Sequence, residues 1–160
     1  MRTRCIFTLS MLSVLSMCLA KVFAQTLTIT FAPSQVADWY YVSDRASSVA
    51  EWYYFTDGPS KVAKWVYFTS DVASADVVLT TELRKDTPWL YISEKPSKVA
   101  DWIYISDTAS TLAEWVYIAD SPKAADVMIY TDDPQLKAPK VVACVLEYMK
   151  KKRKQQDDNE

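Results

Sequence analysis

The sequence predicts an all-β domain of eight to ten short strands built from a repeated unit, and three observations lead to this prediction. The stretch KVADWIYISD at residues 98–107 returns as QVADWYYVSD, SVAEWYYFTD, KVAKWVYFTS and TLAEWVYIAD. Each copy holds about five consecutive residues rich in Trp, Tyr, Val, Ile and Phe, types that favour strands, in a run too short for a helix. The copies also follow one another at nearly equal intervals, which is typical of a repeat protein.

A secretory signal is expected before the repeat. Arg2 and Arg4 precede an apolar run over residues 5–20, and the triplet Val-Phe-Ala ends at Ala24. This order of charge, apolar run and small residues is typical of a signal peptide at residues 1–24, and the run is short for a transmembrane span. We expect cleavage between Ala24 and Gln25 and a secreted or periplasmic protein.

The alternative leader is a lipoprotein signal that ends at Cys18. Met17 places a bulky side chain where such a site needs Gly or Ala. Cleavage after Ala24 leaves one cysteine, Cys144, so the mature chain would have no internal disulfide. Cys144 lies in the apolar run VVACVL and is expected to be a small buried hydrophobe, not a nucleophile.

Charge separates a body from a tail. Cleavage takes the basic count from 18 to 15 against 20 acidic residues, so the formal charge goes from −2 to −5. Residues 25–149 then form one acidic repeat domain, with no nucleic acid expected as a partner. Residues 150–160, KKKRK followed by QQDDNE, are expected to be a charged, disordered tail. The alternative is weak contact of the basic run with anionic surfaces.

The spacing of the units reveals an internal duplication. An Ala precedes the aromatic run at Ala37, Ala50, Ala63, Ala75, Ala100, Ala113 and Ala125, and Thr87 takes the place of Ala in the fifth unit. The intervals 13, 13, 12, 12, 13, 13, 12 repeat after four units, so every marker in the first half has a partner 50 residues later. Residues 35–82 should therefore superpose on residues 85–132. Weaker units are TLTITF (26–31) and KVVACV (140–145).

Each unit predicts a turn followed by a strand. Segments such as PSQVA and GPSKVA combine Pro with a Ser whose hydroxyl can accept a hydrogen bond from an amide two or three residues later. Both faces of the strands are apolar, so a second sheet or other passes of the chain should cover both. Gly58 is the only glycine, so Asn-Gly hairpins cannot be the joining rule. The links of seven to eight residues can carry the chain to a strand that is not its immediate neighbour.

The units SQVADWYYV, SKVADWIYI and STLAEWVYI resemble the septoil-knot domain family, whose members repeat motifs like SQAD followed by VYFV. The resemblance spans roughly residues 27–145. It implies an all-β domain whose backbone forms a seven-crossing torus knot, which winds twice around its axis, and it carries no catalytic motif. The chain departs from the family pattern by placing Trp after the acidic position, and by degenerate fourth, fifth and eighth units.

Catalytic and metal sites have few candidates in this sequence. The chain has no His, so a Ser-His-Asp or Cys-His arrangement cannot form, and no metal or other cofactor is expected. Carboxylates recur beside the marker Ala, at strand edges or turns where solvated or capping side chains are common. They are Asp38, Glu51, Asp76, Asp101, Glu114 and Asp126. A glycosidase pair or a calcium site is the less favoured interpretation of these residues.

The tryptophans are the best candidate binding residues. If exposed in a row, they would suit stacking against sugar rings or another apolar ligand, but packing in the core is the favoured expectation. These residues are Trp39, Trp52, Trp65, Trp89, Trp102 and Trp115. We therefore predict a secreted, non-catalytic structural or interaction module whose partner the sequence does not name. The alternatives are a carbohydrate-binding protein and, after it, an enzyme.

The exported protein should begin at Gln25, because the Val-Phe-Ala triplet is the best processing site. Mass spectrometry of the exported form measures this directly. An amino terminus at a lipid-modified Cys18 would contradict both the cleavage site and the predicted free, secreted form.

Overall fold

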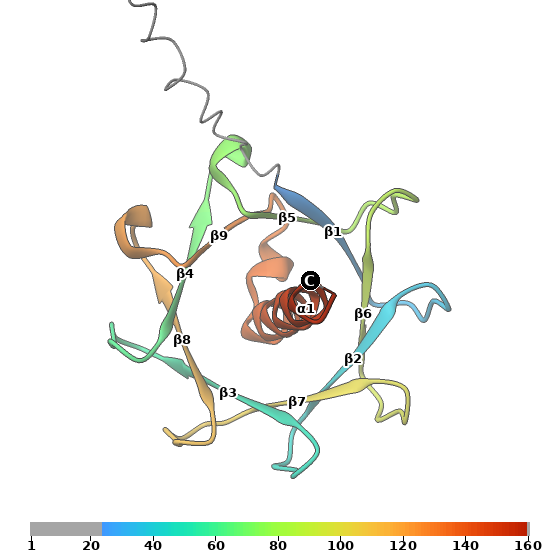
Figure 1. Ribbon diagram of the computed structural model, residues 1–160, viewed down its shortest axis with the longest axis horizontal. Coiled ribbons are helices and arrows are strands. Elements are labelled where there is room, and N and C mark those ends of the chain that lie inside the picture. Colours follow the sequence, from blue (N-terminus) through green and yellow to red (C-terminus); the bar gives the residue numbers. More distant parts are fainter. Residues whose placement is uncertain (1–23, 160) are drawn as a thin grey trace, which may run out of the picture.

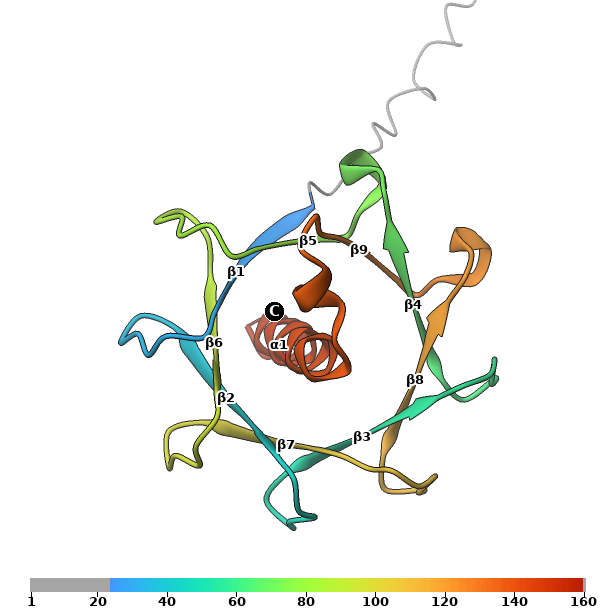
Figure 2. The ribbon, with the colours of Figure 1, turned by 180° about the vertical axis from the view of Figure 1, so that it is seen from behind.

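The computed structural model describes residues 24–159, which form a closed barrel of parallel strands around a central helix (Figures 1 and 2). The predicted signal peptide lies outside the described residues, apart from Ala24. The strands are β1 (Gln25–Thr30), β2 (Asp38–Ser43), β3 (Glu51–Thr56), β4 (Lys64–Thr69), β5 (Val77–Thr80), β6 (Trp89–Ser93), β7 (Asp101–Ile105), β8 (Glu114–Ala119) and β9 (Val127–Tyr130). Short 3-10 turns are η1 (Val72–Ser74), η2 (Pro122–Ala124) and η3 (Pro134–Lys137), and α1 (Pro139–Asp157) ends the chain.

The strand order shows how the chain winds. Around the barrel the order is β1-β5-β9-β4-β8-β3-β7-β2-β6, with β6 pairing back to β1. Consecutive strands are therefore always two positions apart, with one strand of the other pass between them. The chain makes two passes around the barrel axis, which confirms the expectation that links lead to non-adjacent strands.

The links are short for parallel strands, which usually need a dozen or more residues, often as a helix. Here each link has seven or eight residues, as between β2 and β3 or between β5 and β6. A strand of six residues rises about 20 Å and a link of seven spans up to about 25 Å, so a link can just return along the outside of the barrel. The links form the points of the star in Figure 1.

The turn chemistry is as predicted from the Ser residues. In the link to β3, Ser47 Oγ accepts a hydrogen bond from the Val49 amide at 3.3 Å, and the Ser47 carbonyl accepts one from the Ala50 amide at 3.2 Å. None of the described residues has a positive φ. The links therefore need no left-handed residue, which explains why one glycine is enough for the fold.

Three of the four paired strand starts lie 50 residues apart, and the starts of β2 and β6, at residues 38 and 89, lie 51 apart. β3 and β7 begin at residues 51 and 101, β4 and β8 at 64 and 114, and β5 and β9 at 77 and 127. In each of these pairs the two strands are also hydrogen-bonded neighbours. Superposition of residues 35–82 on residues 85–132 stays a prediction.

The fold is mostly β, as predicted, but its core is the contact between the barrel wall and α1, a helix that the sequence analysis did not expect. All eight residues from Val141 to Tyr148 are buried around the whole helix. They pack against inward residues of every strand, including Tyr40, Tyr53 and Ile103. KVVACV was expected to be a further strand unit, but its apolar run surrounds a helix in the bore. An apolar run of this length fits either element, and its surroundings decide between them.

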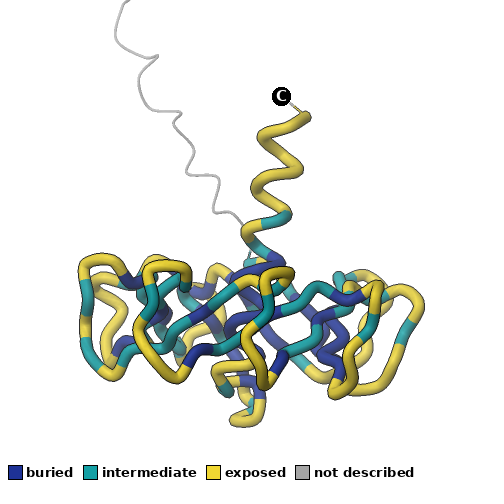
Figure 3. The backbone as a smooth tube through the Cα atoms, turned by 90° about the horizontal axis from the view of Figure 1, so that it is seen from below, coloured by how far each residue is buried: buried dark blue, intermediate teal, exposed yellow. Residues whose placement is uncertain are grey.

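The charged tail also differs from the prediction. Residues 150–157 continue α1 instead of forming a disordered segment. Figure 3 shows this end of the helix standing out of one face of the disk-shaped barrel, with exposed residues along it. A helix already formed by the buried half can be extended residue by residue at little cost, because nucleation is complete.

Shortening an apolar side chain of α1 should destabilise the whole barrel. Leu146 is 2% exposed, so Leu146→Ala should lower the free energy of unfolding by roughly 2–5 kcal/mol. The matched control is Gln156→Ala on the exposed end of the same helix, which should change it by less than about 0.5 kcal/mol. Equilibrium unfolding in denaturant measures both free energies. Equal effects of the two variants would contradict the conclusion that the buried half of α1 stabilises the barrel.

Candidate functional site

The six tryptophans lie on the outer wall of the barrel, not in the core as expected. Trp102, for example, is half-buried, while its neighbour Ile103 is fully buried against α1. Side chains alternate between the two faces of a strand, so Trp and the Tyr two residues later share the outer face. The core instead takes the intervening residues.

Each indole is tied to the link that precedes its strand. The indole N–H donates to the carbonyl oxygen of the residue five positions earlier, at 2.7–3.1 Å. The pairs are Trp39 with Ser34, Trp52 with Ser47, Trp65 with Ser60, Trp89 with Arg84, Trp102 with Ser97 and Trp115 with Ser110. The repeated Ser thus closes the turn and the repeated Trp closes the link onto the wall.

Five of the tryptophans also pack edge-to-face against a tyrosine on the neighbouring strand. Ring centroids are 4.7–5.0 Å apart and the planes cross at 69–82°. The pairs are Trp39–Tyr91, Tyr41–Trp102, Trp52–Tyr104, Tyr54–Trp115 and Trp65–Tyr117, and in each pair the residues are direct register partners. Such pairs contribute about 0.5–1.5 kcal/mol each beyond their buried area. They brace five successive strand contacts from β6 to β4.

The remaining part of the wall has different residues at these positions. Thr28 lies opposite Trp89, and Tyr67 lies opposite Met128. Thr28 is fully buried and its hydroxyl lies 2.7 Å from that of Thr87. The degenerate fourth and fifth units predicted from the sequence therefore lie beside the place where the barrel closes.

One outer groove combines an aromatic pair with charged groups. It has a volume of about 370 Å³ and lies between the Tyr41–Trp102 pair and the start of the β2–β3 link. The link contributes Ser43, Asp44, Arg45, Ala46 and Ser47. Asp44 and Arg45 are exposed, so this groove (the Arg45 groove) offers both stacking and ionic contacts to a ligand.

The carboxylates beside the marker Ala form a ring at one mouth of the barrel. Because all strands are parallel, their first residues lie at the same end, where the basic part of α1 emerges. Lys150 Nζ lies 3.0 Å from Glu51 Oε2, and Lys151 forms an ion pair with Asp101. The basic run therefore contacts its own domain, a role that the sequence analysis did not assign to it.

Other carboxylates of the ring bind backbone or side-chain groups of neighbouring strands. Asp76 Oδ2 accepts the Met128 amide at 2.7 Å, and Asp126 Oδ2 accepts the Trp65 amide at 2.7 Å. Glu114 pairs with Lys64 of the adjacent strand at 2.8 Å. These contacts agree with the expected structural role at strand edges.

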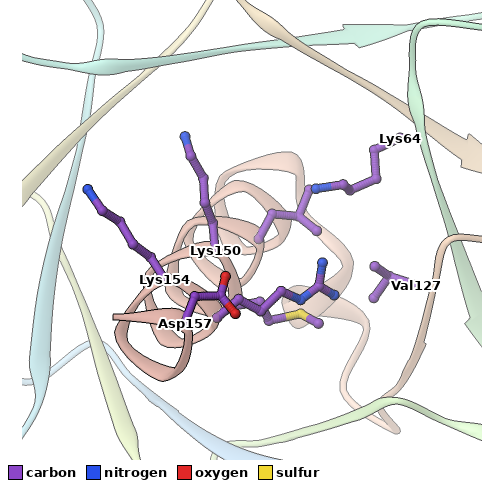
Figure 4. A pocket seen from close by; sticks show the side chains of 8 residues that line it. Lys64, Val127, Lys150, Lys154 and Asp157 are labelled. Atoms are coloured by element: carbon purple, nitrogen blue, oxygen red, sulfur yellow. The ribbon is translucent and has the colours of Figure 1, made fainter. Parts of the chain in front are cut away.

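A cavity of about 250 Å³ lies at the same mouth, between α1 and the wall (Figure 4). Lys64 and Val127 line the wall side, and Lys150, Lys154 and Asp157 are on the helix side. Burial acts to lower the pKa of Lys150, but its hydrogen bond to Glu51 and the charge of Glu147 outweigh this effect, so the pKa is raised. The cation is thus held in its charged form by the acidic ring.

The bore contains one buried carboxylate with its partners. Tyr53 donates its hydroxyl proton to Glu147 Oε2 at 3.0 Å, and Lys150 Nζ lies 3.4 Å from the same oxygen. Burial, and then the charge of Glu147, raises the pKa of Tyr53 well above its usual range. Burial likewise raises the pKa of Cys144, which is fully enclosed and fits the expected small hydrophobe.

Metal-ligating clusters and membrane-spanning helices are both absent from residues 24–159. These residues contain no group of three or more His, Cys, Asp or Glu side chains that could hold a metal ion. None of their helices combines the length and the apolar character needed to cross a membrane.

The comparisons with known proteins returned no match. No family model, no curated protein and no solved structure matches this chain.

Two features of the surface were not predicted. Val36, Val49, Val62, Val99 and Leu112 are 71–77% exposed, each at the same turn position. The pairing of Trp with Tyr across strands was missed as well. The Trp-x-Tyr spacing that recurs along the chain is consistent with such pairs, but the strand order that brings a Trp opposite a Tyr does not follow from the sequence.

High pH should unfold the protein through its buried phenols and thiol. Burial raises the pKa of Tyr40, Tyr53 and Tyr148 above 10.0 and that of Cys144 above 9.0, so the native state binds more protons than the unfolded state at alkaline pH. The contribution of the thiol falls above about pH 9 and that of the phenols above about pH 10, by up to about 1.4 kcal/mol per pH unit for each group. Denaturant titrations from pH 7 to 12 measure it.

Tyr40→Phe provides the internal comparison, because it removes one of these groups from the bore. Above pH 10, the free energy of unfolding of this variant should fall less steeply with pH than that of the wild type. The difference in slope should correspond to the loss of one titrating group, up to about 1.4 kcal/mol per pH unit. An unchanged slope, or wild-type stability that stays constant to pH 12, would contradict the assignment.

Proposed function

We propose that this chain is an exported, non-catalytic structural or interaction module whose durability is kinetic. The observation that carries the proposal is the path of the chain: two interleaved passes build the barrel, and α1 then fills the bore. A native state of this kind must be disassembled in order, so escape from it should be slow. Slow unfolding suits a protein that has no disulfide within residues 24–159 and would meet proteases outside the cell.

We further propose that the backbone is knotted, in the seven-crossing form implied by the septoil-knot resemblance. The support is the strand order, in which consecutive strands of the chain are always separated by one other strand, so that the second pass runs through the gaps left by the first. Knots are very rare in proteins, so this is a demanding proposal. The same order accounts for an internal repeat of 50 residues, since each pass would need nearly the same units.

Two further observations support export and a non-catalytic role. β1 begins at Gln25, the residue expected after cleavage, and the Gln25 side chain donates a hydrogen bond to Tyr148 Oη at 3.1 Å. The polar groups that could carry chemistry in the bore are engaged with one another, as Glu147 is with Tyr53. Their visible task is to hold α1 to the wall.

The second candidate function is carbohydrate binding by the outer wall. It is favoured by the half-exposed indoles, which lie beside polar link residues instead of inside the core. Aromatic faces next to hydrogen-bonding groups suit the alternating apolar and polar surfaces of sugar rings.

Unfolding rates test the structural proposal. The intact protein should unfold slowly in strong denaturant, and protease should first cut the exposed last turns of α1, leaving residues 27–145 intact. An engineered protease site at Gly58–Pro59 then removes any knot by cutting the first pass. After this cut, the unfolding rate should increase, and the increase should be larger than the accompanying decrease in the free energy of unfolding can account for.

The matched control is the same protease site inserted after Lys154, which cuts the chain outside the barrel and should leave the unfolding rate unchanged. Unfolding of the intact chain within milliseconds in moderate urea would refute kinetic stability. Equal rates for the two cut proteins, at equal stability, would refute the knot while leaving the barrel intact.

A further inference from the structure

We propose that the Arg45 groove binds an acidic sugar, with the ring of a uronic acid on the Tyr41–Trp102 pair and its carboxylate on Arg45. This inference rests on the carbohydrate-binding candidate and specifies its ligand class and its site. The groove is lined by Tyr41, Trp102 and the residues 43–47 of the β2–β3 link.

The aromatic pair supplies the stacking surface. The two rings are 5.0 Å apart and cross at 74°, so they form a corner instead of one flat plate. The Trp102 indole is held in place by its hydrogen bond to the Ser97 carbonyl at 3.1 Å. Because both rings are fixed before binding, little side-chain entropy is lost when a sugar packs against them.

Arg45 distinguishes this groove from the corresponding links. The position after the first acidic residue of a link is Arg45 here, but Gly58, Lys95, Thr108 and Ser121 in other links. A guanidinium binds a carboxylate through two parallel hydrogen bonds, which a lysine cannot do. Arg45 is exposed, and it belongs to none of the ion pairs formed within residues 24–159.

The backbone that carries Arg45 is fixed at both ends. Ser43 Oγ donates to the Arg45 carbonyl at 2.8 Å and accepts from the Arg45 amide at 3.1 Å. The Ser47 carbonyl accepts the Trp52 indole N–H at 3.0 Å. The short segment between them therefore presents its guanidinium from a preorganised turn, although the side chain itself is free to reach the ligand.

The charge of Asp44 should affect acidic and neutral sugars in opposite ways. Its exposed carboxylate stands beside Arg45 and repels a uronate while competing for the guanidinium. A neutral sugar would not be repelled, and an Asp44 carboxylate could accept hydrogen bonds from its hydroxyls. Removal of this charge should therefore tighten binding of an acidic sugar and weaken or leave unchanged the binding of a neutral one.

The experiment is a titration of the full mature chain with tri-galacturonate and, separately, with maltotriose as a neutral trisaccharide. Shifts of the Trp102 indole N–H signal in NMR spectra report binding at this groove. An open groove for about one sugar ring predicts weak affinity, with a Kd on the order of 1 mM. Arg45→Gln should weaken tri-galacturonate binding at least 10-fold, and Asp44→Asn should strengthen it severalfold.

Arg84→Gln is the matched control, because Arg84 is an exposed arginine of another link and pairs with Glu82 at 2.9 Å. It should leave binding unchanged, and the amide spectra of all three variants should show an intact barrel. Equal losses in Arg45→Gln and Arg84→Gln would overturn the site, since binding would then follow overall charge. Equal binding of both trisaccharides without effect of Arg45→Gln would overturn the acidic-sugar inference but keep the carbohydrate candidate. If neither trisaccharide binds, both the acidic-sugar inference and the carbohydrate-binding candidate are refuted.

Discussion

The whole barrel depends on the burial of α1 in its bore. Parallel sheets are stable when both faces are covered, and strands of four to six residues have little stability of their own. The eight buried residues 141–148 cover the inner face of all strands at once. The outer face is covered by the links and by the Trp–Tyr pairs, so the wall is supported from both sides without a second sheet.

This arrangement places the decisive element after all nine strands in sequence order. β1 pairs with β5 and β6, whose residues lie roughly 50 to 60 positions later, and α1, which follows β9 in the sequence, packs in the same core as strands from β1 onward. Loop-closure entropy must be lost before these distant contacts form, so we expect slow folding. The ion pairs at the mouth of the barrel then join the emerging helix to β3 and β7.

The surface separates structure from recognition. Units share the residues that build the wall, whereas the polar residues at the start of each link differ from one unit to the next. A repeat scaffold can in this way carry one distinctive groove without loss of packing. The proposed acidic-sugar site uses such a local difference, since Arg45 stands where other links have a smaller or less directional side chain.

The sequence by itself determined the strands, their links and the repeat, because aromatic and β-branched runs and Ser turns act locally. The approximate positions of β2 to β9, the wide links and the 50-residue offset between the starts of β3, β4 and β5 and those of β7, β8 and β9 followed from pattern alone. Whether KVVACV is a helix or a strand, and whether Trp39 or Tyr40 enters the core, was decided only by the tertiary structure. A short apolar run fits either element, and a strand with two apolar faces does not say which one points inward. The closed ring made that choice, because only its inner face meets α1.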